Sequence, residues 1–161
     1  MYIFIGSNSG ISKNILNLPL GKEKILALYR KEKPNLKKKN IIYEKFDIRQ
    51  NNFSKIIDII NKQKDKKLTI VNFSSLKIDK LSIKISKKDF KDSFEVNLFG
   101  YFNFLQCILP IMIRNNWGRV INISSTGGLR GDIGTSLYSS SKNASLGLFK
   151  VLSKEYAKFN I

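Results

Sequence analysis

Short apolar runs that alternate with helical patterns constrain the fold of this chain more than any other feature. Strands buried on both faces of a parallel sheet have near-continuous apolar sequences of this kind. The predicted strands are MYIFIGS (1–7), KILALY (24–29), NIIYEKFD (40–47), LTIVNFS (68–74) and GRVINISS (118–125). The predicted helices cover residues 10–18, 52–63, 88–115 and 136–159. This alternation predicts a single α/β domain over residues 1–161, with a doubly wound parallel sheet.

Composition narrows the classes of function. The chain has one cysteine and no histidine, which excludes a disulfide framework, a Cys/His zinc site and Ser-His-Asp or Cys-His catalysis. A net charge of +17 suggests an anionic partner such as nucleic acid. However, the lysines are spread along the chain, as A/T-rich codon usage produces, so nucleic-acid binding is the weakest interpretation. The longest apolar run, 101–113, is shorter than the roughly 18–20 residues that span a bilayer. No leader pattern is visible, and we expect a cytoplasmic protein without a membrane partner.

The turn GSNSG (6–10) joins the first predicted strand to the first predicted helix. Glycines allow a tight turn and a close approach of the backbone, and a helix N-terminus offers N–H donors and the positive end of its dipole. A dinucleotide-binding, Rossmann-like fold places its phosphate site at this turn. The candidate coenzyme contacts here are Gly6, Ser7, Asn8, Gly10 and Ile11.

The segment YSSSK places Tyr138 and Lys142 four residues apart, on one face of a predicted helix. A lysine ammonium favours the phenolate form of a neighbouring tyrosine, which can then exchange a proton with an alcohol or ketone. The alternative is two polar residues on a solvated helix. The segment alone does not decide between them.

Taken together, these motifs resemble the short-chain dehydrogenase/reductase family, most closely its classical reductases related to 3-oxoacyl-carrier-protein reductase. The family pattern Thr-Gly-x-x-x-Gly-x-Gly corresponds to IGSNSGIS, in which Ser12 replaces the third glycine. Asp47, followed by Ile48, matches the acidic residue that receives the adenine amino group. Asn72 matches the first residue of the family's Asn-Asn-Ala-Gly segment, whereas the next three residues, Phe-Ser-Ser, depart from it. The resemblance implies a sheet with the strand order 3-2-1-4-5.

The resemblance also assigns catalytic roles. Tyr138 is implied as the general acid/base, and Lys142 is implied to support it electrostatically and to hold the nicotinamide ribose. Ser125 is implied to bind the substrate carbonyl, and Asn97 to hold a water that relays protons to Lys142. Four roles in one order make this a much stronger signal than YSSSK alone. The implied reaction is hydride transfer with a nicotinamide coenzyme and needs no metal.

The residues after the second strand bear on the choice of coenzyme. NAD enzymes place a carboxylate there, whereas a basic residue suits the 2′-phosphate of NADP. This chain has Arg30 and Lys31 at that place, so we expect Arg30 to favour NADP(H). NAD(H) stays open, because Glu32 follows directly.

The family continues beyond the point that corresponds to Ile161, with further strands and a substrate-covering helix. We therefore expect the domain to be truncated at its C-terminus. A catalytically inactive dinucleotide-binding or scaffold protein is the alternative to a working reductase. Apolar stripes on the two long helices, together with the family's habit of pairing them, predict a homodimer or homotetramer. The substrate stays open among acyl thioesters, sugars and small ketones.

Overall fold

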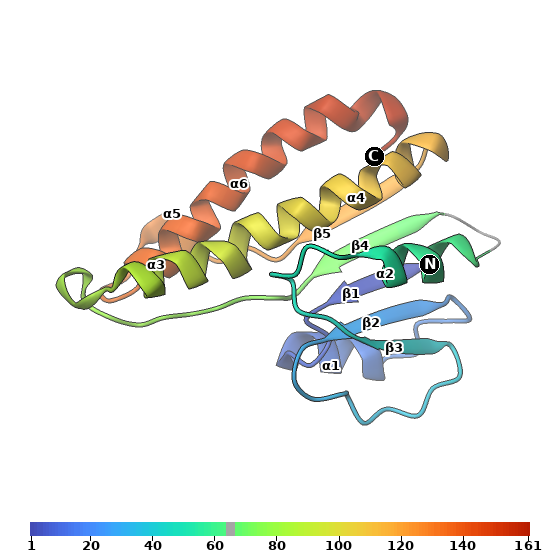
Figure 1. The fold of residues 1–161 in the computed structure, drawn as a ribbon, viewed down its shortest axis with the longest axis horizontal. Coiled ribbons are helices and arrows are strands. Elements are labelled where there is room, and N and C mark those ends of the chain that lie inside the picture. The colour runs from blue at the N-terminus through green and yellow to red at the C-terminus, as the bar shows by residue number, and fades with distance from the viewer. Residues whose placement is uncertain (64–66) are drawn as a thin grey trace.

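The computed structural model describes residues 1–63 and 67–161, and within these ranges five strands form one parallel sheet (Figure 1). The strands are β1 (Tyr2–Ile5), β2 (Ile25–Tyr29), β3 (Ile41–Lys45), β4 (Leu68–Asn72) and β5 (Gly118–Asn122). Their order in the sheet is β3-β2-β1-β4-β5, and every neighbouring pair is parallel. Both the fold class and the strand order predicted from the sequence are confirmed.

The helices lie close to their predicted ranges. They are α1 (Gly10–Asn17), α2 (Ser54–Asn61), α3 (Lys87–Phe94), α4 (Gly100–Arg114), α5 (Gly127–Arg130) and α6 (Ser136–Tyr156), with short 3₁₀ turns η1 (Ser82–Lys84) and η3 (Ala157–Phe159). The predicted helix 88–115 is α3 and α4 joined by a π-helical segment, η2 (Glu95–Phe99). The sequence predicted neither this segment nor α5. Ser86 is the N-cap of α3, and Asp89 completes its capping box.

Apolar side chains on the two faces of the sheet build two cores, because successive residues of a strand point to opposite faces. Ile3 and Ile5 of β1 belong to the larger core, into which α2 and α4 also pack. Phe4, between them, belongs to the smaller core, where Leu16 of α1 is completely buried. Figure 1 shows α4 and α6 running side by side along the β5 end of the sheet. The carboxyl ends of the strands are thereby left for polar residues.

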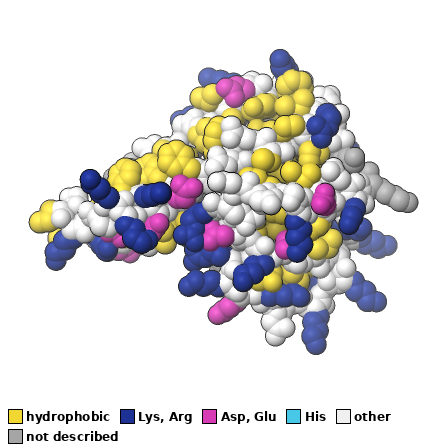
Figure 2. Space-filling view, viewed as in Figure 1, with side chains coloured by type: hydrophobic (Ala, Val, Ile, Leu, Met, Phe, Trp, Pro, Cys, Tyr) yellow, Lys and Arg dark blue, Asp and Glu magenta, His cyan; other side chains and the backbone are white. Residues whose placement is uncertain are grey.

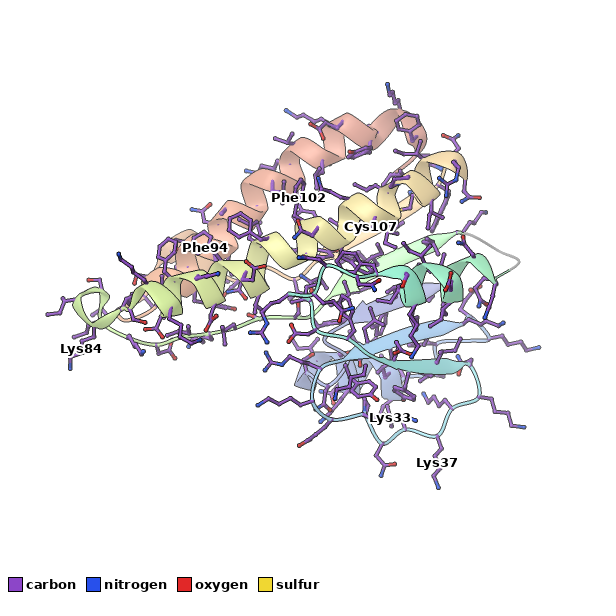
Figure 3. The ribbon with its side chains drawn as sticks, viewed as in Figure 1. Lys33, Lys37, Lys84, Phe94, Phe102 and Cys107 are labelled. Carbon is purple, nitrogen blue, oxygen red and sulfur yellow. The ribbon has the colours of Figure 1, made fainter. Side chains whose placement is uncertain are left out.

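The connection between β2 and β3, residues 30–40, contains no helix. Leu36 packs into the smaller core instead, and Tyr43 donates a hydrogen bond from its hydroxyl to the Leu36 carbonyl (3.1 Å). Lys38 donates to three carbonyl oxygens at the C-terminal end of α1, at 2.7, 3.0 and 2.8 Å. Lys37 is exposed and extends outward in Figure 3, whereas Lys38 caps a helix.

Gly100, the first residue of α4, packs directly against the backbone of the segment that follows β3. A Cβ at this position would lie 2.4 Å from the carbonyl oxygen of Ile48. Real Cβ atoms do not approach backbone oxygens so closely, so only glycine lets the long helix and this segment meet. The contact fixes the position of the Asp47–Ile48 segment beneath α4.

The continuous helix Lys87–Arg114 is longer than the apolar run considered from the sequence. By length and composition alone it could cross a membrane, because its most apolar window has a mean hydropathy of 1.6. However, 56% of that window is buried inside the protein, against the sheet and α6. Such burial is typical of the core helix of a globular domain.

Candidate active site

A cavity of about 250 Å³ opens at the carboxyl ends of the central strands. The strand order reverses direction between β1 and β4, and open α/β sheets bind ligands at such a switch point. The residues that line the cavity are Ile5, Gly6, Asn8, Ser9, Arg30, Lys31, Phe46, Asp47, Ile48, Phe73, Ser74, Ser75 and Val96. Five of the predicted coenzyme residues are thus brought together: Gly6, Asn8, Arg30, Asp47 and Ile48.

The turn that leads into α1 has the geometry of an anion-binding loop. Gly6 has a φ of +77°, and a Cβ there would lie 2.8 Å from the backbone nitrogen of Ser74. The N-cap Ser9 accepts a hydrogen bond from the backbone N–H of Ser12 (3.2 Å). The hydroxyl of Ser7 is completely buried and has no hydrogen-bond partner among residues 1–63 and 67–161. A tight glycine turn, a helix N-terminus and an unpartnered hydroxyl together fit a phosphate-bearing coenzyme.

The far end of the cavity is basic. Arg30 and Lys31 line it, whereas Glu32 does not. The carboxylate of Asp47 is held by the guanidinium of Arg49, with nitrogen–oxygen distances of 2.9 and 2.6 Å. This hydrogen-bonded ion pair keeps the pKa of Asp47 below its usual value, and the charge of Arg30 lowers it further. Sequence reasoning missed Arg49, whose spacing of two residues from Asp47 was the available signal.

Lys142 and Tyr138 lie together at the N-terminal half of α6, as the spacing predicts. The Lys142 ammonium is 5.8 Å from the centre of the Tyr138 ring and donates to the carbonyl of Ile123 (2.8 Å). Lys142 is only 4% exposed, and this burial lowers its pKa. Tyr138 is half-buried and keeps contact with solvent. A buried cation beside an accessible phenol is suited to proton exchange with a bound substrate.

Ser125 follows β5 and stands beside the short helix α5. Its hydroxyl oxygen accepts a hydrogen bond from the backbone N–H of Gly127 (3.1 Å). A Cβ on the next residue, Gly128, would lie 3.1 Å from the Cβ of Lys142, so α5 packs closely on the turn that carries the lysine. The segment between Ser125 and Tyr138 is therefore folded onto the site. Glycines in this loop were the sequence signal for that close approach.

Asn97, in η2, joins three parts of the site. Its Oδ1 accepts from the backbone N–H of Leu76 (2.7 Å), and its Nδ2 donates to the Leu76 carbonyl (2.9 Å) and to the Ser141 hydroxyl (2.9 Å). Ser141 directly precedes Lys142, so Asn97 fixes both the loop after β4 and the turn of α6 that carries Tyr138 and Lys142. The structure thereby brings the four predicted catalytic positions into one region.

Other predicted coenzyme residues do not line the cavity. Ser7 is buried beneath the turn, Gly10 opens α1, and Ile11 is 57% exposed on the first turn of that helix. Asn72 is buried, and its Oδ1 accepts from the backbone N–H of Ser74 (3.0 Å). The Asn72 side chain therefore holds the cavity wall in place.

Comparison with known proteins gives a consistent result. Residues 3–161 match the family model described as short chain dehydrogenase. The 3-oxoacyl-[acyl-carrier-protein] reductase FabG of Aquifex aeolicus is 39% identical over 92 residues, which cover 57% of this chain and 37% of that protein. Carbonyl reductase family member 4 of Xenopus tropicalis is 36% identical over 92 residues, covering 57% of this chain and 39% of that protein. The alignments thus span less than half the length of these curated relatives.

Solved structures resemble almost the whole chain. The structure described as ElxO with NADP bound aligns with a TM-score of 0.86 and 26% identity, covering 98% of this chain and 68% of that one. The structure of 4-hydroxyisoleucine dehydrogenase complexed with NADH and succinate aligns with a TM-score of 0.84 and 24% identity, covering 100% and 75%. At that identity the second comparison supports the fold alone.

Proposed function

The chain belongs to the short-chain dehydrogenase family, and on that premise we propose that it is an NADP(H)-dependent oxidoreductase for a small carbonyl or alcohol substrate. The observation that carries the proposal is the pair Tyr138 and Lys142, on a helical turn that Asn97 holds by a hydrogen bond to Ser141. The coenzyme, when bound, would supply or accept the hydride. We also propose that the protein is cytoplasmic.

The side chains divide the remaining work. Tyr138 gives a proton to the substrate oxygen in reduction and takes it back in oxidation. The ammonium of Lys142 stabilises the phenolate and holds the ribose of the coenzyme. Ser125 donates a hydrogen bond to the same substrate oxygen, where negative charge develops. Asn97 orders a relay water. Because its side-chain amide already donates to the Leu76 carbonyl and the Ser141 hydroxyl, the water would donate a hydrogen bond to a carbonyl oxygen of Asn97.

The coenzyme contacts follow the cavity. The backbone around Gly6, together with Ser7, Asn8, Gly10 and Ile11, receives the pyrophosphate at the N-terminus of α1. The segment Asp47–Ile48 takes the adenine, and Asn72 supports the wall beside the ribose. Because Arg49 already binds the Asp47 carboxylate, the adenine amino group would share that carboxylate with the guanidinium.

The function is tested by separating coenzyme binding from turnover. NADPH should bind to the purified protein, seen as a change in its fluorescence, and be oxidised when an acetoacetyl thioester or a small ketone is added. The competing proposal is an inactive dinucleotide-binding protein, favoured by Ser74 and Ser75 in the cavity wall, where the family has Ala and Gly. It predicts NADPH binding with no carbonyl-dependent oxidation. Absence of NADPH binding would contradict both.

The proposed preference for NADP(H) over NAD(H) depends on the positive charge of Arg30, directly after β2. Arg30→Glu should weaken NADPH binding about 10- to 100-fold, because a charge-assisted hydrogen bond is worth about 1.5–3 kcal/mol. NADH binding should be unchanged or tighter, since a carboxylate there suits a free ribose 2′-hydroxyl. Both dissociation constants are measured by fluorescence titration. Lys39→Glu, on the same loop but outside the cavity, is the control for the change in charge. An equal loss for both coenzymes would contradict the assignment.

A homodimer or homotetramer is part of the proposal. Figure 2 shows apolar side chains gathered on the arm formed by α3 and the start of α4. Phe90 of α3 and Phe99 of η2 are each about half exposed, and Phe90 stacks on Phe94 with a ring separation of 4.7 Å. An exposed aromatic row on a long helix is suited to pairing with a second copy.

A further inference from the structure

The polar side chains beneath α6 form one continuous hydrogen-bonded chain that the proposed chemistry does not use. It begins at the cavity wall, where the Ser74 hydroxyl donates to Asn72 Oδ1 (2.5 Å). Asn72 Nδ2 donates to Asn122 Oδ1 (3.2 Å), across the paired strands β4 and β5. Asn122 Nδ2 donates to Ser145 Oγ (3.2 Å), and Ser145 Oγ donates to the Lys142 carbonyl (2.7 Å). The chain therefore runs from the coenzyme cavity to the catalytic lysine.

Every donor in this chain points in the same direction, from Ser74 toward α6. Asn72 and Ser145 are 1% and 2% exposed, so water does not compete for their bonds. Hydrogen bonds aligned in a low-dielectric interior polarise one another. Removing one member leaves its neighbour buried without a partner, which costs more than the bond itself contributes.

Ser145, like Ser141, is buried on α6, donates to a carbonyl of its own helix and accepts a hydrogen bond from an asparagine side chain. Ser140 also donates to carbonyls of its own helix, at 2.7 Å to Ser136, but its side chain lies on the exposed face. Ser153 does the same with the Lys150 carbonyl (2.9 Å) and is exposed as well. A serine on the buried face of a helix packs less well than an apolar residue. The bond from Asn122 gives Ser145 a role that a back-bonded serine alone lacks.

Strand β5 and the residue after it hold Lys142 at two points. Through Ser145, the Asn122 side chain holds the main-chain carbonyl of Lys142. The next residue, Ile123, accepts a hydrogen bond from the ammonium at the other end of the same lysine. The main chain and the ammonium of this long, flexible lysine are thus held from two adjacent residues, Asn122 and Ile123. This is what placing a cation beside the Tyr138 ring requires.

We propose that Ser145 is a positioning residue for Lys142, held in place from the coenzyme cavity through Asn72 and Asn122. The proposal rests on the proposed function for its catalytic consequence. The placement of Lys142 by the Ser145 hydroxyl can be tested whether or not the protein catalyses a reaction.

The test compares Ser145→Ala with Ser145→Thr, which keeps the hydroxyl, and with Ser140→Ala, which removes a back-bonded hydroxyl outside the chain. The first readout is the titration of the Lys142 ammonium by NMR, in protein whose lysines carry ¹³C. Burial lowers the pKa of Lys142, and a loosened turn lets the ammonium reach water. We expect the midpoint to rise toward the ordinary lysine value in Ser145→Ala. It should stay unchanged in Ser145→Thr and Ser140→Ala.

The second readout is steady-state kinetics with NADPH. In Ser145→Ala we expect kcat to fall about tenfold, from the loss of a buried hydrogen bond, while KM for NADPH changes by less than about twofold. A wild-type Lys142 titration in Ser145→Ala would overturn the proposal, and so would a Ser145→Thr protein that behaves like Ser145→Ala. If neither the wild-type protein nor any variant oxidises NADPH, the proposed function fails. The Lys142 titration still decides the role of Ser145 in that case. Circular dichroism melting confirms that each variant is folded.

Discussion

Tyr138→Phe is expected to abolish carbonyl-dependent NADPH oxidation while leaving NADPH binding intact. The substitution removes only the hydroxyl, so the ring keeps its place beside Lys142, but no group remains to give the substrate oxygen its proton. General acid catalysis contributes about 10²–10⁴-fold, and kcat should fall by that factor. Turnover is followed by NADPH absorbance, and binding by NADPH fluorescence.

The matched control for this prediction is Tyr156→Phe, the same change near the end of the same helix. Tyr156 packs against the larger core, far along α6 from the catalytic turn. Its variant should retain wild-type kcat. Substantial turnover in Tyr138→Phe would show that another group supplies the proton, and the mechanism proposed for this site would be wrong.

Lys142→Met is expected to lose activity without losing stability. Removing the cation withdraws support from the phenolate and from the coenzyme ribose, so kcat at neutral pH should fall roughly 10²-fold or more. In the direction of alcohol oxidation, where Tyr138 acts as the base, activity should recover partly toward pH 10, because an unassisted phenol ionises there. Lys150→Met, which replaces an exposed lysine of the same helix, should remain active.

The stability part of this prediction follows from the direction of the Lys142 pKa shift. Burial lowers the pKa of Lys142 below 10.5, so the folded protein holds this proton less tightly than the unfolded chain. The cost of the buried charge is fully present at neutral pH, and it is relieved as pH rises from the folded pKa to 10.5. Lys142→Met lacks that cost. Its Tm relative to wild type should therefore be highest at neutral pH and decline as pH approaches 10.5, and a constant difference would contradict this reasoning.

The sequence predicted the sheet well because buried parallel strands and a glycine turn are local patterns. The strands, the turn at Gly6 and the pairing of Tyr138 with Lys142 each depend on residues a few positions apart. The placement of Asn97 and Ser125 came from the order of the family motifs. Their assigned roles stay predictions.

What the sequence did not predict depends on contacts between distant segments. Nothing local distinguishes Lys38 from the lysines beside it. Its ammonium nevertheless caps the C-terminus of α1, because the fold brings that helix end within its reach. Gly100 meets Ile48 across more than fifty residues of sequence. Contacts such as these are set by tertiary packing, which neither periodicity nor residue propensity encodes.

The π-helical segment Glu95–Phe99 also sets the rotational phase of the longest helix. One π-turn adds a residue to the winding, so all later side chains are rotated by about 100° relative to an unbroken α-helix. Phe99 thereby comes within 6.4 Å of Phe94, five residues earlier, while the residues of α4 still face the core. Deleting one residue from this segment would restore regular α-helical winding. It would also either separate Phe99 from Phe94 or turn the apolar side of α4 away from the core. The segment therefore tolerates a change of side chain more readily than a change of length.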